Sequence, residues 1–421
     1  MRYETLTEWL AWQETLHPQA IDLGLDRVRR VADRLKLDLG QTFTITVGGT
    51  NGKGSCVAML ETIFREAGYR VGAYTSPHIL KYNERIAVSG QPVDDARIIE
   101  SFDKIDQARG ETTLSFFEFG TLAALDIFRS ESLDIQILEV GLGGRLDAVN
   151  IVSADIALVA SIDVDHQDWL GTTRELIGLE KAGIFRKGRP AVVGDPDVPQ
   201  SVLDFSKQSE TPLKWVGRDF DFSLTDHGLW TWSDADTVIK DLPLPSIPGQ
   251  HQLMNVSSVL EVVKLAQNRF PVSEAEIRRA LPKVTLKGRY QLFPGEVPVL
   301  LDVAHNPQAV RMLCQYLRTG LTYQKLHAVF SVMRDKDIAE ILEVMKKEVD
   351  IWYLAPLKMN RAAPPEMLAD MLSEAGITSV HMGYEDVKSA VERAKRNAVS
   401  GDLILVFGSF FLVSEFLATC A

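Results

Sequence analysis

A glycine-rich turn between a predicted strand and a predicted helix constrains this chain more than any other feature. The turn, Gly48–Ser55, follows the β-branched run Thr42–Val47 and leads into a helical stretch, Lys53–Ala67, which ends at Gly68. Arg70–Tyr74 then has the composition of a second buried strand. A strand, a glycine turn, a helix and a strand in that order are typical of a parallel α/β sheet.

The residue types in this turn suit the binding of phosphate groups. Glycines allow backbone N–H groups to point at phosphate oxygens, and the start of the following helix adds a favourable dipole. We expect Gly52, Lys53, Gly54 and Ser55 to bind the phosphates of a nucleotide, with Lys53 reaching the outer phosphates. Gly54 stands between Lys53 and Ser55, so this is not a strict Walker A loop. A glycine turn without a ligand is the alternative, but four glycines and a lysine are costly for a mere turn.

The length and a second alternation of strands and helices predict two α/β domains. A chain of 421 residues exceeds one typical core. Residues 1–284 are expected to form an N-terminal P-loop domain with a mainly parallel sheet. A tryptophan-rich stretch, Lys214–Pro248, predicts a small antiparallel subregion within it, and the first 40 residues have helical spacing. A linker at 285–296 then leads to a smaller Rossmann-like domain, 297–421.

Composition argues against several classes of protein. A net charge of −12 disfavours non-specific binding to nucleic acid, which needs clustered Lys and Arg. No apolar run reaches the roughly 18 residues that span a bilayer, and Met1–Leu10 lacks the pattern of a signal peptide. Cys56, Cys314 and Cys420 are too widely spaced for a disulfide framework. We therefore expect a cytoplasmic protein with no nucleic-acid or membrane partner.

Polar side chains lie at the ends of three strand-like runs, where parallel strands open onto a ligand crevice. Ser76 follows Arg70–Tyr74, Glu139 lies near the end of Asp134–Val140, and His166 follows Asp155–Ile162. A carboxylate at the end of a buried strand is costly unless it has a partner, and beside a phosphate loop that partner is expected to be Mg²⁺. A salt bridge from Glu139 to Arg145 and a structural role for His166 are the alternatives.

The loop sequence GTNGKGS resembles that of the folylpolyglutamate synthase/dihydrofolate synthase family, in the Mur-ligase-like superfamily. Four more segments carry the resemblance: EKAGIF around Lys181, GRYQ around Arg289, DVAHNP from Asp302, and HQLMN, which ends at Asn255. Gln252 stands where the family pattern of the last segment has Asn.

This resemblance implies roles for the metal-binding and nucleotide-binding residues. Ser76 and Glu139 would hold Mg²⁺ on the nucleotide phosphates, and His166 and Lys181 would support a second Mg²⁺, with Lys181 carbamylated. A carbamate is an oxygen-bearing anion that suits a hard cation.

Three residues outside the P-loop are implied to contact ATP. Arg289 would bind its phosphates, Asp302 the nucleotide and Asn255 the adenine. Lys53, Lys181 and His305 would be the catalytic residues, with His305 close to the phosphates and the acyl group.

Two segments, Ile21–Arg27 and Leu114–Gly120, resemble the bifunctional bacterial branch of the family. The second segment, together with the stretch Arg145–Ala148, implies a pterin or folate pocket formed by Ser115, Phe116, Phe117, Glu118, Leu146, Asp147 and Ala148. Aromatic rings stack on a flat pterin, and a carboxylate accepts from its N–H groups. The alternative role of the phenylalanines is core packing. Val149 departs from the family triplet, which has Thr at that position.

The reaction implied is an ATP-dependent ligation by a monomer. ATP would phosphorylate the carboxyl group of dihydropteroate or of a reduced folate, and the amino group of L-glutamate would attack the acyl phosphate. A Mur-type amino-acid ligase, a simple P-loop hydrolase or kinase, and a non-catalytic folate- or nucleotide-binding paralogue are the alternatives. A non-catalytic copy would be expected to have lost Lys53, Glu139, His166 or Lys181, and all four are present.

Overall fold

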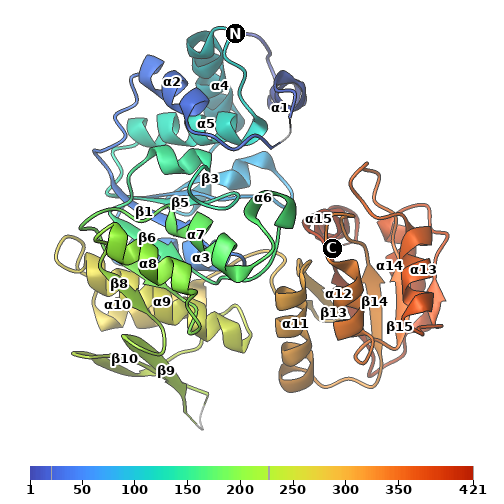
Figure 1. Cartoon of the computed structure of the whole chain (residues 1–421). Helices are drawn as coiled ribbons and strands as arrows, with labels where there is room; N and C mark the ends of the chain where they lie inside the picture. Colours follow the sequence, from blue (N-terminus) through green and yellow to red (C-terminus); the bar gives the residue numbers. More distant parts are fainter. Residues whose placement is uncertain (20, 226–227, 421) are drawn as a thin grey trace. The chain divides into compact units, whose positions relative to one another are not determined.

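The computed structural model describes residues 1–19, 21–225 and 228–420. The chain divides into two compact units (Figure 1). The first comprises Met1–Ser246 and Gln252–Val284, and the second comprises Ile247–His251 and Thr285–Ala421.

The first unit is built around an eight-stranded sheet in the order β4-β3-β2-β5-β1-β6-β7-β8. The six strands β2-β5-β1-β6-β7-β8 are parallel to their neighbours in the sheet. Strands β3 and β4 continue the sheet at one edge and pair antiparallel. The central strands are buried along their whole length, as expected for a parallel sheet covered on both faces. The strands are β1 (Phe43–Gly48), β2 (Val71–Tyr74), β3 (Ile86–Val88), β4 (Gln91–Pro92), β5 (Ile135–Glu139), β6 (Ile156–Val159), β7 (Ala191–Val193) and β8 (Leu213–Trp215).

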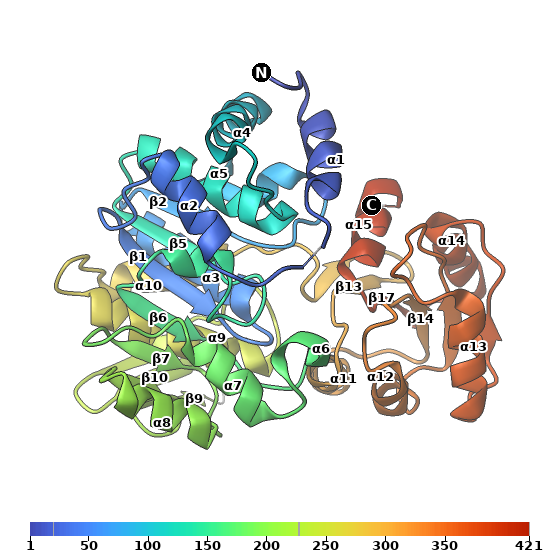
Figure 2. The same cartoon turned by 45° about the horizontal axis from the view of Figure 1, so that its top comes forward.

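Helices cover both faces of this sheet. The connection from β1 to β2 passes through α3, and the connection from β2 to β5 passes through α5. These two connections run in opposite directions along the sheet. Because such connections are right-handed, α3 and α5 lie on opposite faces. Figure 2 shows α2, α4 and α5 gathered near the N-terminus. The helices are α1 (Leu6–Leu16), α2 (Asp26–Arg34), α3 (Lys53–Glu66), α4 (Asp95–Arg109), α5 (Phe116–Ser130), α6 (Gln167–Leu170), α7 (Arg174–Ala182), α8 (Gln200–Gln208), α9 (Gln250–Ala266) and α10 (Glu274–Ala280). The short 3₁₀ helices are η1 (Tyr82–Arg85), η2 (Ala148–Ile151) and η3 (Leu281–Lys283).

A separate three-stranded antiparallel sheet, β9 (Phe220–Leu224), β10 (Trp230–Asp234) and β11 (Val238–Leu242), lies against α9. Trp230 and Trp232 are buried, and the Trp232 indole N–H donates to the Ser257 carbonyl on α9 at 3.1 Å. This sheet is the antiparallel subregion that the sequence predicts.

The second unit is a six-stranded sheet in the order β12-β13-β17-β14-β15-β16, parallel except for β12. Phe330, Trp352 and Phe407 meet at the centre of its core, with ring centroids 4.9–6.2 Å apart. The strands are β12 (Gln291–Phe293), β13 (Val299–Asp302), β14 (Leu326–Phe330), β15 (Ile351–Leu354), β16 (Val380–His381) and β17 (Leu403–Phe407). The helices are α11 (Pro307–Gly320), α12 (Ile338–Met345), α13 (Pro365–Glu374), α14 (Val387–Asn397) and α15 (Phe410–Thr419).

The predicted fold class is confirmed: a mainly parallel α/β unit with a small antiparallel sheet, and a smaller α/β unit. The prediction of one continuous helical pattern over the first 40 residues is wrong, because α1 ends at Leu16, shortly before Pro18, and α2 is a separate helix that begins at Asp26. Strand β12 lies inside the stretch predicted as a linker. A three-residue edge strand is too short to show a period in the sequence.

Within the described part of the chain, none of the helices combines the length and the apolar character needed to cross a membrane.

Replacing Phe330 by Ala should destabilise the second unit by about 3–5 kcal/mol, because a buried ring that contacts two others would leave a cavity. Phe411→Ala is the matched control, since this phenylalanine of the same unit is 46% exposed and its loss should change stability by no more than ~0.5 kcal/mol. Urea denaturation followed by circular dichroism would measure both. Equal destabilisation by the two substitutions would contradict the packing described.

Candidate active site

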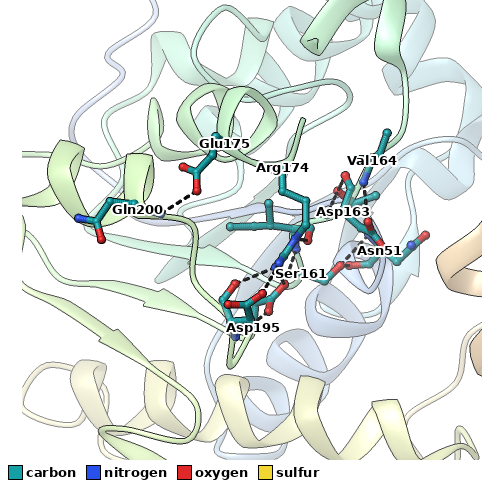
Figure 3. A network of polar contacts seen from close by, with 11 residues as sticks. Asn51, Ser161, Asp163, Val164, Arg174, Glu175, Asp195 and Gln200 are labelled. Atoms are coloured by element: carbon teal, nitrogen blue, oxygen red, sulfur yellow. Dashed lines mark hydrogen bonds and ion pairs between the residues drawn. The ribbon is translucent and has the colours of Figure 1, made fainter. Parts of the chain in front are cut away.

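The phosphate loop is held against the end of strand β6 by reciprocal hydrogen bonds. The Asn51 N–H donates to the Ser161 hydroxyl oxygen, and that hydroxyl donates to the Asn51 carbonyl, both at 3.0 Å. The Thr50 hydroxyl likewise donates to the Asp163 carbonyl at 2.9 Å and accepts the Asp163 N–H at 3.0 Å. The loop therefore keeps its shape through contacts within the chain (Figure 3).

A second layer of polar contacts fixes the end of β6 itself (Figure 3). Asp195, after β7, accepts the Ile162 N–H at 3.0 Å and pairs with Arg174 at 3.2 Å. The Arg174 Nε–H donates to the Ile162 carbonyl at 2.9 Å. Sequence reasoning missed Ser161, Asp195 and Arg174, because they match no motif and their role depends on which strands are neighbours.

Gly52 precedes helix α3 as its N-cap, in a conformation that favours glycine. Its φ is +86°, and a Cβ there would lie 2.6 Å from Oδ1 of Asn255. Asn255, predicted to contact adenine, therefore lies directly against the phosphate loop. Lys53 folds over the loop and donates to the Gly49 and Thr50 carbonyls at 3.0 and 3.2 Å. Gly54 and Ser55 follow in the first turn of α3.

Glu139 and Ser76, predicted from separate strand ends, are brought together. Glu139 is 4% exposed, and its carboxylate accepts the Ser76 N–H at 3.0 Å. Strand β5 pairs with β1 so that Glu139 lies beside Val47, immediately before the phosphate loop. Arg145, the alternative partner of Glu139, instead pairs with Glu180 at 2.7 Å.

Lys181 is buried at the end of helix α7, only 3% exposed. Burial, together with the charge of nearby Lys53, lowers the pKa of Lys181 to about 7, and Asp165 opposes this shift. His166, next to Asp165, adopts a left-handed backbone conformation with φ +53°.

Among the described residues, no group of three or more His, Cys, Asp or Glu side chains is arranged to hold a metal ion. The predicted set would not form such a group, because Ser76 and Lys181 supply half of its members.

The two segments predicted to form the pterin pocket lie close together, and the N-terminal segment that shares the family resemblance contacts one of them. The Gly24 N–H donates to the Leu146 carbonyl at 3.2 Å, and a Cβ on Gly141 would lie 2.7 Å from the Phe117 ring. Asp147 accepts N–H groups from Leu142 and Val149 at 2.8 and 3.0 Å, and burial raises its pKa to about 7. Ala148 starts the buried helix η2 directly after it.

Ser115 and Glu118 have a structural task in the same region. Ser115 caps helix α5, and Glu118 closes the capping box by accepting the Ser115 N–H at 2.8 Å. Arg27 pairs with Glu118 at 3.2 Å and with Asp22 at 2.6 Å. The helix start is thus tied to the N-terminal segment. Phe119 belongs to the core, whereas Phe116 and Phe117 are half-buried.

In the second unit, the predicted residues gather at the end of strand β13. Asp302 is buried and accepts the N–H groups of Tyr290 and Ala304 at 3.0 and 2.7 Å. Burial raises its pKa, and Arg289 opposes the shift.

His305 donates from Nδ1 to the Val303 carbonyl at 2.8 Å. Arg289 and His305 both contact the Phe410 ring, at 5.0 and 5.9 Å from its centroid. Phe410 was missed because nothing in the sequence links the start of the last helix to residues more than a hundred positions earlier.

Comparison with known proteins gives one consistent result. The family described as Mur ligase, glutamate ligase domain, matches residues 288–410. The dihydrofolate synthase/folylpolyglutamate synthase of Escherichia coli (strain K12) is 42% identical over 410 residues, which cover 97% of this chain and 94% of the relative. The Haemophilus influenzae protein of the same name is 40% identical over 433 residues, covering 98% and 97%.

Solved structures agree. E. coli FolC in complex with DHPP and ADP has a TM-score of 0.93 at 42% identity, covering 99% of this chain and 97% of that one. A bifunctional folylpolyglutamate synthase/dihydrofolate synthase with Mn, AMPPNP and L-glutamate bound has a TM-score of 0.90 at 42% identity, covering 99% and 98%. Because the identity extends over nearly the full length of each relative, the chain belongs to the dihydrofolate synthase/folylpolyglutamate synthase family.

Proposed function

We propose that this protein is an ATP-dependent ligase that adds L-glutamate to dihydropteroate and to reduced folates. Its relatives carry both activities in their names, and related structures hold ADP, AMPPNP, L-glutamate and DHPP. The three cysteines are free, which fits a reducing cytoplasm as the site of action. We expect a single chain to be the working unit.

One arrangement carries the proposal: the parts of the first unit that we assign to phosphate, metal and acceptor adjoin one another. Glu139 lies beside Val47, immediately before the phosphate loop, and accepts the Ser76 N–H. The Arg145 N–H donates to the Glu180 carbonyl at 2.8 Å, which joins the proposed pterin-binding stretch to the helix turn that carries Lys181. These contacts support a single site for phosphate binding, metal support and acceptor binding.

The first step is transfer of the γ-phosphoryl group of ATP to the acceptor carboxylate, and the glutamate amine then displaces phosphate. Backbone N–H groups of the loop and the start of α3 bind phosphate oxygens, and Lys53 neutralises charge on the transferred group. Ser76 and Glu139 are adjacent, and both have side-chain oxygens, the ligand type that Mg²⁺ prefers. Bound Mg²⁺ would neutralise charge on the phosphates.

Lys181 is proposed to be carbamylated and to support a second Mg²⁺ together with His166. Attack on CO₂ requires a neutral amine, and a lysine with a pKa of about 7 supplies one at neutral pH. The product is an anion with two oxygens, which removes the cost of a buried ammonium beside Lys53.

The acceptor pocket is proposed to lie between Phe116 and Phe117 on one side and Leu146–Ala148 on the other. Half-buried rings leave faces on which a flat pterin can stack. The Asp147 carboxylate accepts two backbone N–H groups and thereby holds the 142–149 loop. We assign it two roles: it shapes the pocket, and it accepts N–H groups of the pterin. Ser115 and Glu118 would contribute backbone groups and position rather than free side chains.

The roles proposed for residues of the second unit follow from the family resemblance of the segments around Arg289 and Asp302. Arg289 would neutralise nucleotide phosphates, Asp302 would contact the nucleotide, and His305 would assist proton transfer at the phosphate or amine. Asn255, in the first unit, is proposed to contact the adenine.

Purified protein should release phosphate from ATP and Mg²⁺ only when both glutamate and an acceptor are present, and it should do so with dihydropteroate and with a reduced folate. Lys53→Ala should lower that rate at least ~100-fold, because charge on the transferred group loses its partner. Release with folate alone would reduce the protein to a polyglutamate extender. No glutamate-dependent release would favour a Mur-type ligase or a non-catalytic paralogue.

Lys181→Ala should lose ~100-fold or more of the activity, and acetate or formate should restore part of it by replacing the carbamate oxygens. The sign of the pH dependence follows from the lowered pKa: below pH 7 the ammonium form prevails, the carbamate is lost and wild-type activity falls. The acetate-rescued variant should lack this acidic loss. Rescue by methylamine in place of acetate would show that the lysine acts as a cation.

A further inference from the structure

Arg85 is a buried arginine that forms no ion pair with any of the residues that the structure describes. It ends helix η1, is 9% exposed, and its Nε–H donates to Nδ1 of His78 at 2.8 Å. Its guanidinium lies over the rings of Tyr82 and Phe116, at 5.5 and 5.3 Å. No carboxylate in the described ranges forms an ion pair with it. The neighbouring Glu84 carboxylate accepts the N–H groups of Ile79 and Leu80 instead.

Arg109 is equally buried but forms an ion pair, so it serves as a comparison for Arg85. It too is 9% exposed and lies over an aromatic ring, that of Trp12, at 5.2 Å. However, it pairs with Asp106 at 2.8 Å and donates to the Gly110 and Thr112 carbonyls. Equal burial with and without a carboxylate partner suggests that the partner of Arg85 comes from outside the chain, since buried charges are normally paired.

The location of Arg85 narrows the choice of partner. The Thr75 N–H donates to the Arg85 carbonyl at 2.9 Å, so Arg85 lies beside the strand end that carries Ser76. Its contact with Phe116 places it at the proposed acceptor pocket as well. Because an arginine Nε–H can only donate, Nδ1 of His78 is the acceptor and the ring carries its proton on Nε2, which is a further donor.

We propose that Arg85 and His78 form a subsite that binds a substrate carboxylate, supplied either by the acceptor or by L-glutamate. A planar guanidinium matches a carboxylate in two-point geometry, which a lysine cannot reproduce. This subsite rests on the proposed function, in which both substrates of the ligation carry a carboxylate.

The test compares the wild type with Arg85→Gln and Arg85→Lys, and with Arg109→Gln as the matched control. Steady-state assays give KM for ATP, glutamate and dihydropteroate. Equilibrium binding of dihydropteroate, and of a pterin without the benzoate carboxylate, is followed by tryptophan fluorescence. Thermal unfolding gives Tm for each variant.

Arg85→Gln should raise KM or Kd for one carboxylate substrate by at least ~30-fold, the lower range for losing one partner of a buried charge pair. KM for ATP and binding of the pterin without a carboxylate should stay within twofold. Arg85→Lys should recover only part of the loss. Arg109→Gln should lower Tm and leave every KM unchanged. Arg85→Gln should lower Tm less, because it loses the hydrogen bond to His78 but breaks no ion pair.

The two sources of the carboxylate give different results. If glutamate supplies it, wild type discriminates against the α-amide or the side-chain amide of glutamate, and Arg85→Gln loses that discrimination. If the acceptor supplies it, dihydropteroate binding weakens without glutamate present.

Unchanged constants for both substrates in a folded Arg85→Gln variant would overturn the inference, as would a fall in Tm as large as that of Arg109→Gln. Failure of the proposed function is separate, since it would appear as a wild type that turns over neither acceptor.

Discussion

The parallel pairing of strand β1 with β5 on one side and β6 on the other is the constraint on which the first unit depends. Val47 lies opposite Glu139, and Gly48 lies opposite Val159, so the three strands end at the same edge of the sheet. Parallel strands leave their carboxyl ends together, and ligands bind where they do so. The phosphate loop, the buried carboxylate and the polar turn after β6 are therefore neighbours although about a hundred residues separate them.

Burial makes the charges at this edge interdependent. Lys53 and Lys181 raise the cost of each other's positive charge, while buried Asp147 resists ionisation. A buried site with neighbouring cations binds anions well, because the attraction between opposite charges is screened less there than in bulk water. An acidic protein can therefore bind anionic substrates: the relevant charge is local rather than net.

The sequence predicts the parts of this protein that have a strong local signature. Buried parallel strands are continuous apolar runs, and the turn before Lys53 has its own residue pattern, so the sheets and the phosphate loop could be foreseen. Strands β3, β4 and β12 could not, because two or three edge residues show no period. The bracing by Arg174, the pairing of Arg27 and the contact of Phe410 depend on tertiary neighbours, which no single stretch of sequence encodes.

The double task of Glu118 limits how this protein can diversify. The same carboxylate completes the cap of α5 and holds Arg27, so the start of α5, beside the proposed pocket, and the N-terminal segment are tied together. Descendants that acquire a new acceptor cannot remodel one without the other. Altered acceptor choice should thus be inherited as a paired exchange of the stretches around 22–27 and 115–118, and a graft of either alone would carry a folding defect that masks any new specificity.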